Sequence, residues 1–319
     1  MPRVLVTQPL PEDLLAPLAD ACELHVLDEG VGLTPELLDD ATGIICLLTD
    51  RVDRALLQQA PKLEFVSSVS VGLDHVDVDA LSERGIPLGH TPGVLVDTTA
   101  DLAFALLLSA ARRLGEADRF VRDGQWVPEE RWTPSFFLGK DVSGATLGIV
   151  GLGAIGQAVA RRAAGFGMEV LGWTPSGRDV DGVTSVTLDE LLARSDFVSV
   201  HVALVEATRD LIDAEKLFAM KPGAVLVNTA RGGIVDEVAL ARALDEGHLY
   251  AAGLDVYEQE PLAPDNPLLH HPRVVFAPHI GSATTQTRLR MVELAVANAL
   301  AALGGKPMPH CANPGAEPA

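Results

Sequence analysis

The stretch Thr146–Gly165 reads TLGIVGLGAIGQAVARRAAG, and its pattern changes twice along its length. Its beginning is apolar and predicts a short buried strand, whereas its end predicts a helix. The turn between them has the pattern G-x-G-x-x-G, with glycines at 151, 153 and 156. That pattern alone is common, but between a strand and a helix it indicates a loop that binds a dinucleotide.

Each position in this turn has an expected role. We expect Gly151 to allow the tight turn, Gly153 to let the backbone approach a pyrophosphate, and Gly156 to bring the helix close to the strand. The unpaired N–H groups of Ala154 and Ile155, at the start of the helix, would bind the anion. The alternative is a glycine-rich turn that binds no ligand.

The next predicted strand, Glu169–Trp173, ends without an acidic residue. An acid at this place hydrogen-bonds the ribose 2′-OH of NAD, and its charge would repel the 2′-phosphate of NADP. Here the chain continues with Thr174 and then Arg178, and a hydroxyl and a guanidinium can both bind a phosphate. The sequence therefore favours NADP as the cofactor. NAD is the alternative if Arg178 is an ordinary solvated residue.

The whole chain alternates short apolar runs with helical patterns, which predicts an α/β fold. One series of strands and helices fills roughly the first hundred residues, and a second runs from Thr146 to about Pro278. A final long helix is expected from about Thr285 to Leu303. A length of 319 residues agrees with two domains. We therefore expect two doubly wound parallel sheets.

Composition excludes several classes of protein. Hydrophobic residues make up 48% of the chain, as in globular proteins, and a net charge of −20 disfavours a nucleic-acid partner. The longest strongly apolar run, Leu102–Ala111, is too short to cross a membrane. The three cysteines lie far apart and no metal-ligand spacing occurs, so we expect no metal and a reducing, cytoplasmic location.

Three further segments follow predicted strands, and each holds one residue suited to catalysis: Arg231, Glu260 and His279. The carboxyl ends of parallel strands lie at one edge of a sheet, so these side chains should lie together. Arg can bind a carboxylate, His can donate a proton near neutral pH, and Glu can fix the His tautomer. Singly, each could be a salt-bridge partner, a solvated turn acid or a buried histidine. Together, downstream of a dinucleotide turn, they indicate a dehydrogenase.

These motifs resemble those of the D-isomer-specific 2-hydroxyacid dehydrogenases over nearly the whole chain. The matching stretches are Gly151–Gly156, Asn228–Gly232, Gly253–Pro261 and Pro278–Ser282. The resemblance implies that Arg231 binds the substrate carboxylate, His279 is the acid/base and Glu260 supports His279. The cofactor contacts that go with it are expected from Thr229, Ala230, Asp255 and Gly281.

A second part of the resemblance is the segment SVGLDH at residues 70–75. It implies that the backbone N–H groups of Val71 and Gly72 bind the substrate carboxylate, although a plain turn would also explain this glycine. Within the family, the chain most resembles glyoxylate/hydroxypyruvate reductases. Their pattern implies substrate-side roles for Ser282 and for Trp132, which would reach across a dimer.

The resemblance also implies the domain organisation. A flavodoxin-like substrate domain would comprise residues 1–98 and 285–319, a Rossmann coenzyme domain would comprise residues 99–284, and a homodimer would form mainly through the coenzyme domains. The expected activity is NAD(P)H-dependent reduction of glyoxylate or hydroxypyruvate to glycolate or D-glycerate. The alternatives are an NAD-linked dehydrogenase acting on D-lactate, 3-phosphoglycerate or phosphite, and a nucleotide-sensing scaffold without activity.

Overall fold

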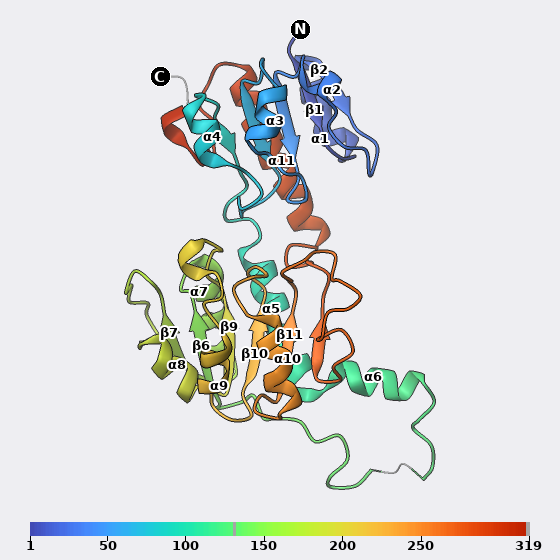
Figure 1. Ribbon diagram of the computed structural model, residues 1–319, viewed down its shortest axis with the longest axis vertical. Coiled ribbons are helices and arrows are strands. Elements are labelled where there is room, and N and C mark those ends of the chain that lie inside the picture. Colours follow the sequence, from blue (N-terminus) through green and yellow to red (C-terminus); the bar gives the residue numbers. More distant parts are fainter. Residues whose placement is uncertain (130–131, 317–319) are drawn as a thin grey trace. The chain divides into compact units, whose positions relative to one another are not determined.

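The computed structural model describes residues 1–129 and 132–316, which divide into two compact units. Unit 1 comprises Met1–Leu95 and Ala283–Ala319, and unit 2 comprises Val96–Ser282. Each unit contains one parallel sheet, and Figure 1 labels most of its elements. The prediction of two doubly wound parallel sheets is therefore confirmed.

The sheet of unit 1 has five strands in the order β2-β1-β3-β4-β5, which is the flavodoxin-like order. Its strands are β1 (Arg3–Val6), β2 (Glu23–Val26), β3 (Gly43–Cys46), β4 (Phe65–Ser68) and β5 (Leu88–Gly89). Its helices are α1 (Glu12–Ala21), α2 (Pro35–Leu38), α3 (Arg54–Gln59), α4 (Val78–Glu83) and α11 (Thr285–Leu303). The helix α11 enters this unit from the far end of the chain.

Alternation along the strands of unit 1 divides its core between the two faces of the sheet, because successive strand side chains point to opposite faces. In β1, Val4 and Val6 pack with α1 and α11, whereas Leu5 packs with α2, α3 and α4. In β3, Ile45 faces the first group and Ile44 faces the second. The sheet is thus covered by helices on both faces.

Unit 2 has a seven-stranded sheet in the order β12-β11-β10-β9-β6-β7-β8. Its strands are β6 (Thr146–Val150), β7 (Glu169–Trp173), β8 (Thr184–Ser185), β9 (Phe197–Val200), β10 (Val225–Asn228), β11 (Ala251–Leu254) and β12 (Val274–Phe276). Its helices are α5 (Val96–Arg112), α6 (Leu114–Arg122), α7 (Ala154–Gly165), α8 (Leu188–Arg194), α9 (Ala214–Ala219) and α10 (Glu237–Asp245). The strand order reverses between β6 and β9, where doubly wound sheets bind ligands.

Aspartate caps start four of the shorter helices in the two units. Asp53 and Asp77 accept hydrogen bonds from backbone N–H groups at the starts of α3 and α4, and Asp213 and Asp236 do the same for α9 and α10. Each cap satisfies an N–H group that has no partner within its own helix. The local sequence therefore fixes where these helices begin.

Helix α6 and the segment after it are features that the sequence patterns did not predict. Arg113 has a φ of 56°, which ends α5 and turns the chain into α6. None of the residues of α6 is buried, and Figure 1 shows α6 and the following chain projecting from the rest of unit 2. An amphipathic helix without a buried face is unusual within a single chain.

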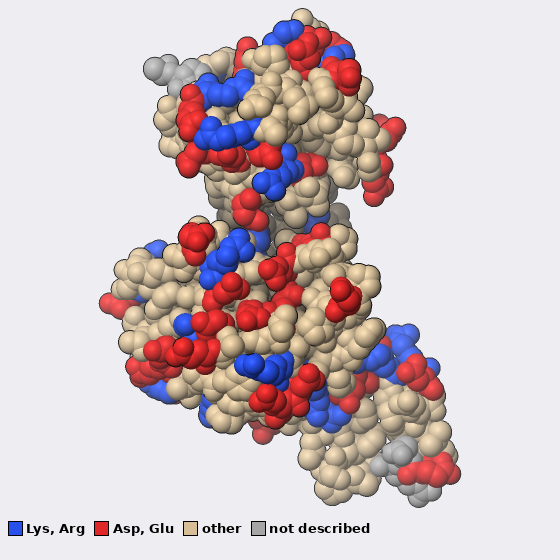
Figure 2. Space-filling view, viewed as in Figure 1, with Lys and Arg blue, Asp and Glu red and all other residues tan. Residues whose placement is uncertain are grey.

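The surface is strongly acidic, as the composition requires. On the face drawn in Figure 2, Asp and Glu side chains are widely spread, and Lys and Arg lie among them without gathering into one patch. Among the described residues, no helix is both long and apolar enough to cross a membrane. The same residues include no cluster of His, Cys, Asp and Glu suited to holding a metal ion.

Candidate active site

The glycine-rich turn between β6 and α7 needs glycine at two positions for steric reasons. Gly151 has a φ of +105°, and a Cβ there would lie 2.7 Å from the backbone carbonyl of His201. A Cβ on Gly156 would lie 2.0 Å from the Gly151 carbonyl oxygen. These contacts explain the tight turn and the close approach of α7 to β6.

Gly153 differs, because a Cβ there would meet nothing within 4 Å. The space beside it is open, and Gly153 is the N-cap of α7 without a side chain that could satisfy the first N–H groups of the helix. The N–H groups of Ala154 and Ile155 belong to that first turn. An open cradle next to a helix N-terminus fits the pyrophosphate of a dinucleotide.

A second turn follows β10 and is held by Asn228. The Asn228 Oδ1 accepts a hydrogen bond from the Ala230 N–H at 3.0 Å, and its Nδ2 donates to the Arg231 carbonyl at 2.9 Å. The Thr229 hydroxyl is buried, and no hydrogen-bond partner for it occurs among the described residues. A buried hydroxyl without a protein partner fits a ligand contact at this turn.

The segments that follow β11 and β12 bring Glu260 and His279 together. His279 Nδ1 lies 2.7 Å from Glu260 Oε2, and the other oxygen of Glu260 accepts the Tyr257 N–H at 3.0 Å. Burial would raise the pKa of Glu260, but the hydrogen bond and charge of His279 outweigh it and lower that pKa below its usual value. The carboxylate therefore accepts the Nδ1 proton, which leaves Nε2 of His279 for a reacting atom.

Arg231 belongs to the same group of side chains. Its charge also helps to lower the pKa of Glu260, and its Nη1 donates to the carbonyl of Ala230 at 2.8 Å. Its neighbour Gly232 must be glycine, because a Cβ there would lie 1.8 Å from the Tyr257 carbonyl oxygen. The turn after β10 and the turn after β11 are thus in direct contact.

Asp255 fixes the backbone around His279. The residue is 1% exposed. Its carboxylate accepts the N–H groups of Ile280 at 2.7 Å and Gly281 at 2.8 Å, while its carbonyl accepts the His279 N–H at 2.9 Å. Burial raises the pKa of Asp255, and these two amides oppose that shift. His279 itself has a φ of 54°, in the left-handed region. Asp255 therefore holds the turn that carries the imidazole.

Two residues of this site were not singled out by their sequence pattern. Asn228 lies directly before Thr229 and orients both sides of its turn, as described above. The Tyr257 hydroxyl shares its one proton between the carbonyls of Ala277, at 2.9 Å, and Leu254, at 3.1 Å, which joins the ends of β11 and β12. Their side chains act through backbone contacts, and such contacts have no spacing that a sequence would reveal. Gln259, two residues after Tyr257, is exposed.

The loop after β7 carries the residues expected to select the cofactor. The Thr174 hydroxyl lies 3.3 Å from that of Ser176, and Arg178 is exposed. Between Trp173 and Arg178 the chain has no carboxylate. The two hydroxyls and the guanidinium are therefore open to an anionic group.

A model of the D-isomer-specific 2-hydroxyacid dehydrogenase NAD-binding domain matches residues 104–281. The chain belongs to this family. It is accordingly an oxidoreductase that uses a nicotinamide dinucleotide, and the site just described, with its open cradle at Gly153 and the unpartnered Thr229 hydroxyl, fits that cofactor.

Relatives and solved structures agree with this family over the full chain. A protein named glyoxylate reductase from Korarchaeum cryptofilum is 47% identical over 98% of this chain and 96% of its own length. The TT0316 protein of Thermus thermophilus has a TM-score of 0.90 at 46% identity, covering 97% of this chain and 99% of that one. An NADPH-dependent glyoxylate/hydroxypyruvate reductase from Sinorhizobium meliloti, solved with NADP and malonate, has a TM-score of 0.88 at 34% identity and covers 98% of both chains.

Four further predicted residues are divided between the two units. Val71 and Gly72 lie in unit 1, in the loop that follows β4. Ser282 is the last residue of unit 2, next to Gly281, whose carbonyl accepts the Thr99 hydroxyl at 3.2 Å. The Trp132 side chain is 78% exposed.

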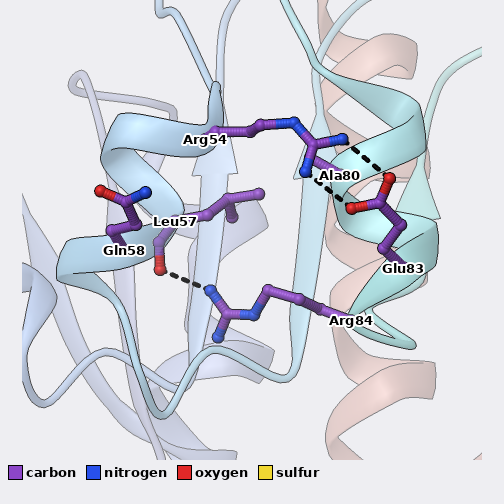
Figure 3. A pocket seen from close by; sticks show the side chains of 6 residues that line it. All are labelled: Arg54, Leu57, Gln58, Ala80, Glu83 and Arg84. Carbon is purple, nitrogen blue, oxygen red and sulfur yellow. Dashed lines mark hydrogen bonds and ion pairs between the residues drawn. The ribbon is translucent and has the colours of Figure 1, made fainter.

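A surface pocket in unit 1 offers no comparable chemistry. Figure 3 shows its lining between α3 and α4, where Arg54 forms two hydrogen bonds with Glu83, at 2.6 and 2.8 Å. Arg84 donates to the carbonyls of Leu57 and Ala60 at the end of α3. Both arginines are thus bonded to protein groups, and these bonds stabilise the packing of α3 against α4.

Proposed function

We propose that this chain reduces a small 2-oxo acid, glyoxylate or hydroxypyruvate, to the 2-hydroxy acid with NAD(P)H. The observation that carries the proposal is the His279–Glu260 pair beside Arg231, in the same sheet as the dinucleotide turn. Relatives named glyoxylate reductase, 41% to 47% identical, support the choice of substrate.

The chemistry divides between the cofactor and the chain. A reduced nicotinamide, when bound, would supply the hydride that the carbonyl carbon accepts. His279 donates the Nε2 proton to the carbonyl oxygen, and Glu260 holds the imidazolium through its Nδ1–H. Arg231 binds the carboxylate of the substrate and polarises the neighbouring carbonyl. Asp255 keeps His279 in place for this transfer.

Other contacts in this proposal follow from the family resemblance. The N–H groups of Val71 and Gly72 bind the substrate carboxylate, and Ser282 lies on the substrate side. The cradle at Gly153 and the hydroxyl of Thr229 hold the cofactor. In this assignment, unit 1 is the substrate domain and unit 2 is the coenzyme domain.

NADPH is the cofactor that we propose as preferred. The support is the loop after β7, where Thr174 and Arg178 are open to a phosphate and the strand end, from Trp173 to Arg178, has no acid. Solved relatives include one with NADP and, at 28% identity, a D-lactate dehydrogenase from Aquifex aeolicus with NAD. Both cofactors therefore belong in the test.

The test is the loss of nicotinamide absorbance with glyoxylate, hydroxypyruvate, pyruvate and 3-phosphohydroxypyruvate, each with NADPH and with NADH. We expect the highest kcat/KM for glyoxylate or hydroxypyruvate with NADPH. Faster turnover of another 2-oxo acid would instead favour one of the other dehydrogenase activities. Tight nucleotide binding without turnover of any 2-oxo acid would contradict the proposal and favour a nucleotide-sensing scaffold.

We also propose a homodimer formed through unit 2. The support is an exposed apolar surface on α6 and the segment after it, which would be costly to leave in water. Its large side chains are 41% to 78% exposed and comprise Leu114, Val121, Trp126, Val127, Trp132 and Leu138. In this arrangement Trp132 would extend toward the partner's active site.

Light scattering after size exclusion tests the dimer. Val121→Glu should convert a dimer into a monomer, whereas Val238→Glu, at an apolar side chain that is 70% exposed on α10, should leave the dimer intact. A wild-type protein that is monomeric at micromolar concentration would contradict the proposal.

We further propose a cytoplasmic location, which agrees with three cysteines that are free thiols.

A further inference from the structure

The loop that follows β4 is held by a chain of side-chain hydrogen bonds that none of the roles above uses. His75 Nε2 lies 3.0 Å from the Ser68 hydroxyl, and the Ser68 hydroxyl lies 2.7 Å from that of Ser70. The Ser70 hydroxyl in turn lies 2.8 Å from the carbonyl oxygen of Gly72. These hydrogen bonds therefore connect His75, through Ser68 and Ser70, to the carbonyl of Gly72.

The Gly72 carbonyl, at the end of this series, determines which group donates in each hydrogen bond. A carbonyl oxygen can only accept, so Ser70 must donate its hydroxyl proton to Gly72. Ser70 therefore accepts from Ser68, and Ser68, having used its own proton, accepts from His75 Nε2–H. All three side chains are thus fixed in one donor order, which requires the Nε2 proton on His75.

The backbone on either side of this turn is fixed as well. The Ser70 carbonyl accepts the Thr91 N–H at 2.8 Å, and the His75 carbonyl accepts the Val52 N–H at 3.0 Å. Ser68 is 0% exposed and Ser70 is 3% exposed, so water does not compete for these hydroxyls. Hydrogen bonds in such surroundings are strong, and an unpaired group there is costly.

The Ser70–Gly72 bond closes a turn around Val71. We propose that Ser70 is a positioning residue that sets the direction of the Val71 and Gly72 N–H groups, and that Ser68 and His75 keep the Ser70 proton on the Gly72 carbonyl. The inference rests on the proposed function, in which those two N–H groups bind the substrate carboxylate. Donors aligned before binding lose less freedom when the substrate arrives, which tightens binding.

The test compares two hydroxyl deletions in the same part of unit 1. Ser70→Ala removes the donor to Gly72 and leaves Ser68 facing a methyl group. Ser67→Ala is the matched control, because the Ser67 hydroxyl is also 0% exposed and donates to the carbonyl of Ala295 in α11. Ser67 precedes Ser68 in β4 but takes no part in the loop.

We expect Ser70→Ala to raise the KM for glyoxylate by about 10-fold, the scale of one buried hydrogen bond, with a smaller change in kcat. The Kd of NADPH should not change. Ser67→Ala should lower the melting temperature without changing KM. Ser70→Thr restores a hydroxyl and should restore KM. His75→Phe, which removes the Nε2–H donor to Ser68, should raise KM in the same direction as Ser70→Ala.

A Ser70→Ala enzyme that keeps the wild-type KM would overturn the inference, as would equal KM changes in the Ser70 and Ser67 variants. If Ser70→Ala does not fold, His75→Phe, which has no side-chain donor, decides by the same KM comparison. A wild-type protein that reduces no 2-oxo acid would instead refute the proposed function, and this inference with it. The two failures are therefore distinguishable, because only the second abolishes wild-type turnover.

Discussion

Replacing Glu260 with glutamine tests how the proton donor is held. Glu260 uses both carboxylate oxygens, one for the Tyr257 N–H at 3.0 Å and one for His279 Nδ1 at 2.7 Å. A glutamine has only one carbonyl oxygen, so it can satisfy one of these donors and must turn its NH2 group toward the other. It also removes the negative charge beside the imidazolium.

The size of the effect follows from the geometry. A hydrogen bond to a charged group contributes about 1.5 to 3 kcal/mol. The side chains of His279 and Glu260 are 24% and 31% exposed, so solvent screens the pair in part and the lower end of that range applies. A loss of about 1.5 to 2 kcal/mol corresponds to a decrease in kcat of roughly 10- to 30-fold.

The assay is the steady-state oxidation of NADPH by glyoxylate, with the Kd of NADPH measured separately. Glu258→Gln is the control, because Glu258 is an exposed acid in the same turn and its loss should leave kcat unchanged. A Glu260→Gln enzyme as active as the wild type would show that this pair does not support the reaction. An equal decrease in kcat in both variants would show that the net charge of the turn matters, rather than the hydrogen bond between Glu260 and His279.

Three other substitutions have definite expected outcomes. His279→Asn, which also tolerates the left-handed backbone, should lower kcat by about 100-fold or more with NADPH binding retained, and near-normal activity would place the proton donor elsewhere. Thr174→Asp should shift the kcat/KM preference from NADPH toward NADH, and an unchanged ratio would refute the assigned role of this loop. Burial lowers the pKa of His201 from 6.5 to about 4, so the folded wild type binds that proton less readily than the unfolded chain and loses stability as the pH falls across this interval. The difference in melting temperature between wild type and His201→Gln should therefore shrink from pH 6.5 to 4, and a constant difference would contradict this prediction.

Much of the fold could be predicted because its signals are local. The apolar run of β6 and the glycines of the following turn predicted strand, turn and helix within one short stretch, and steric contacts at Gly151 and Gly156 explain why that signal is strong. Helix α6 was not predicted, because it has only nine residues and includes Gly115, a weak helix former. Its half-buried Phe120 packs on Phe136 and Phe137 of the next segment, a contact that no sequence pattern shows. The break before it depends on one left-handed residue, Arg113, a conformation that the sequence does not favour there.

The site shows the same division. Arg231, Glu260 and His279 could be singled out as candidates because each follows a strand and has a side chain with distinctive chemistry. The two amides bound by Asp255 and the serine chain that leads to Gly72 could not, since they depend on distances between backbone and side-chain atoms. For Asp255 the sequence indicated a contact with the cofactor, and the structure adds that its carboxylate braces the His279 turn.

The two ends of the chain build unit 1, and this affects the order in which a growing polypeptide can fold. Residues 1–95 leave the ribosome before unit 2 is made, but α11, whose Met291, Val292 and Ala295 belong to the same apolar cluster as Val4 and Val6, is made after it. A nascent chain that has reached residue 282 therefore holds all of unit 2, while one face of the β1–β5 sheet still lacks α11. Val4 and Val6 then remain incompletely covered throughout the synthesis of almost two hundred further residues. Slow translation of unit 2 would prolong the time for which this apolar surface is exposed. Newly made chains with exposed apolar surface tend to aggregate or to bind chaperones.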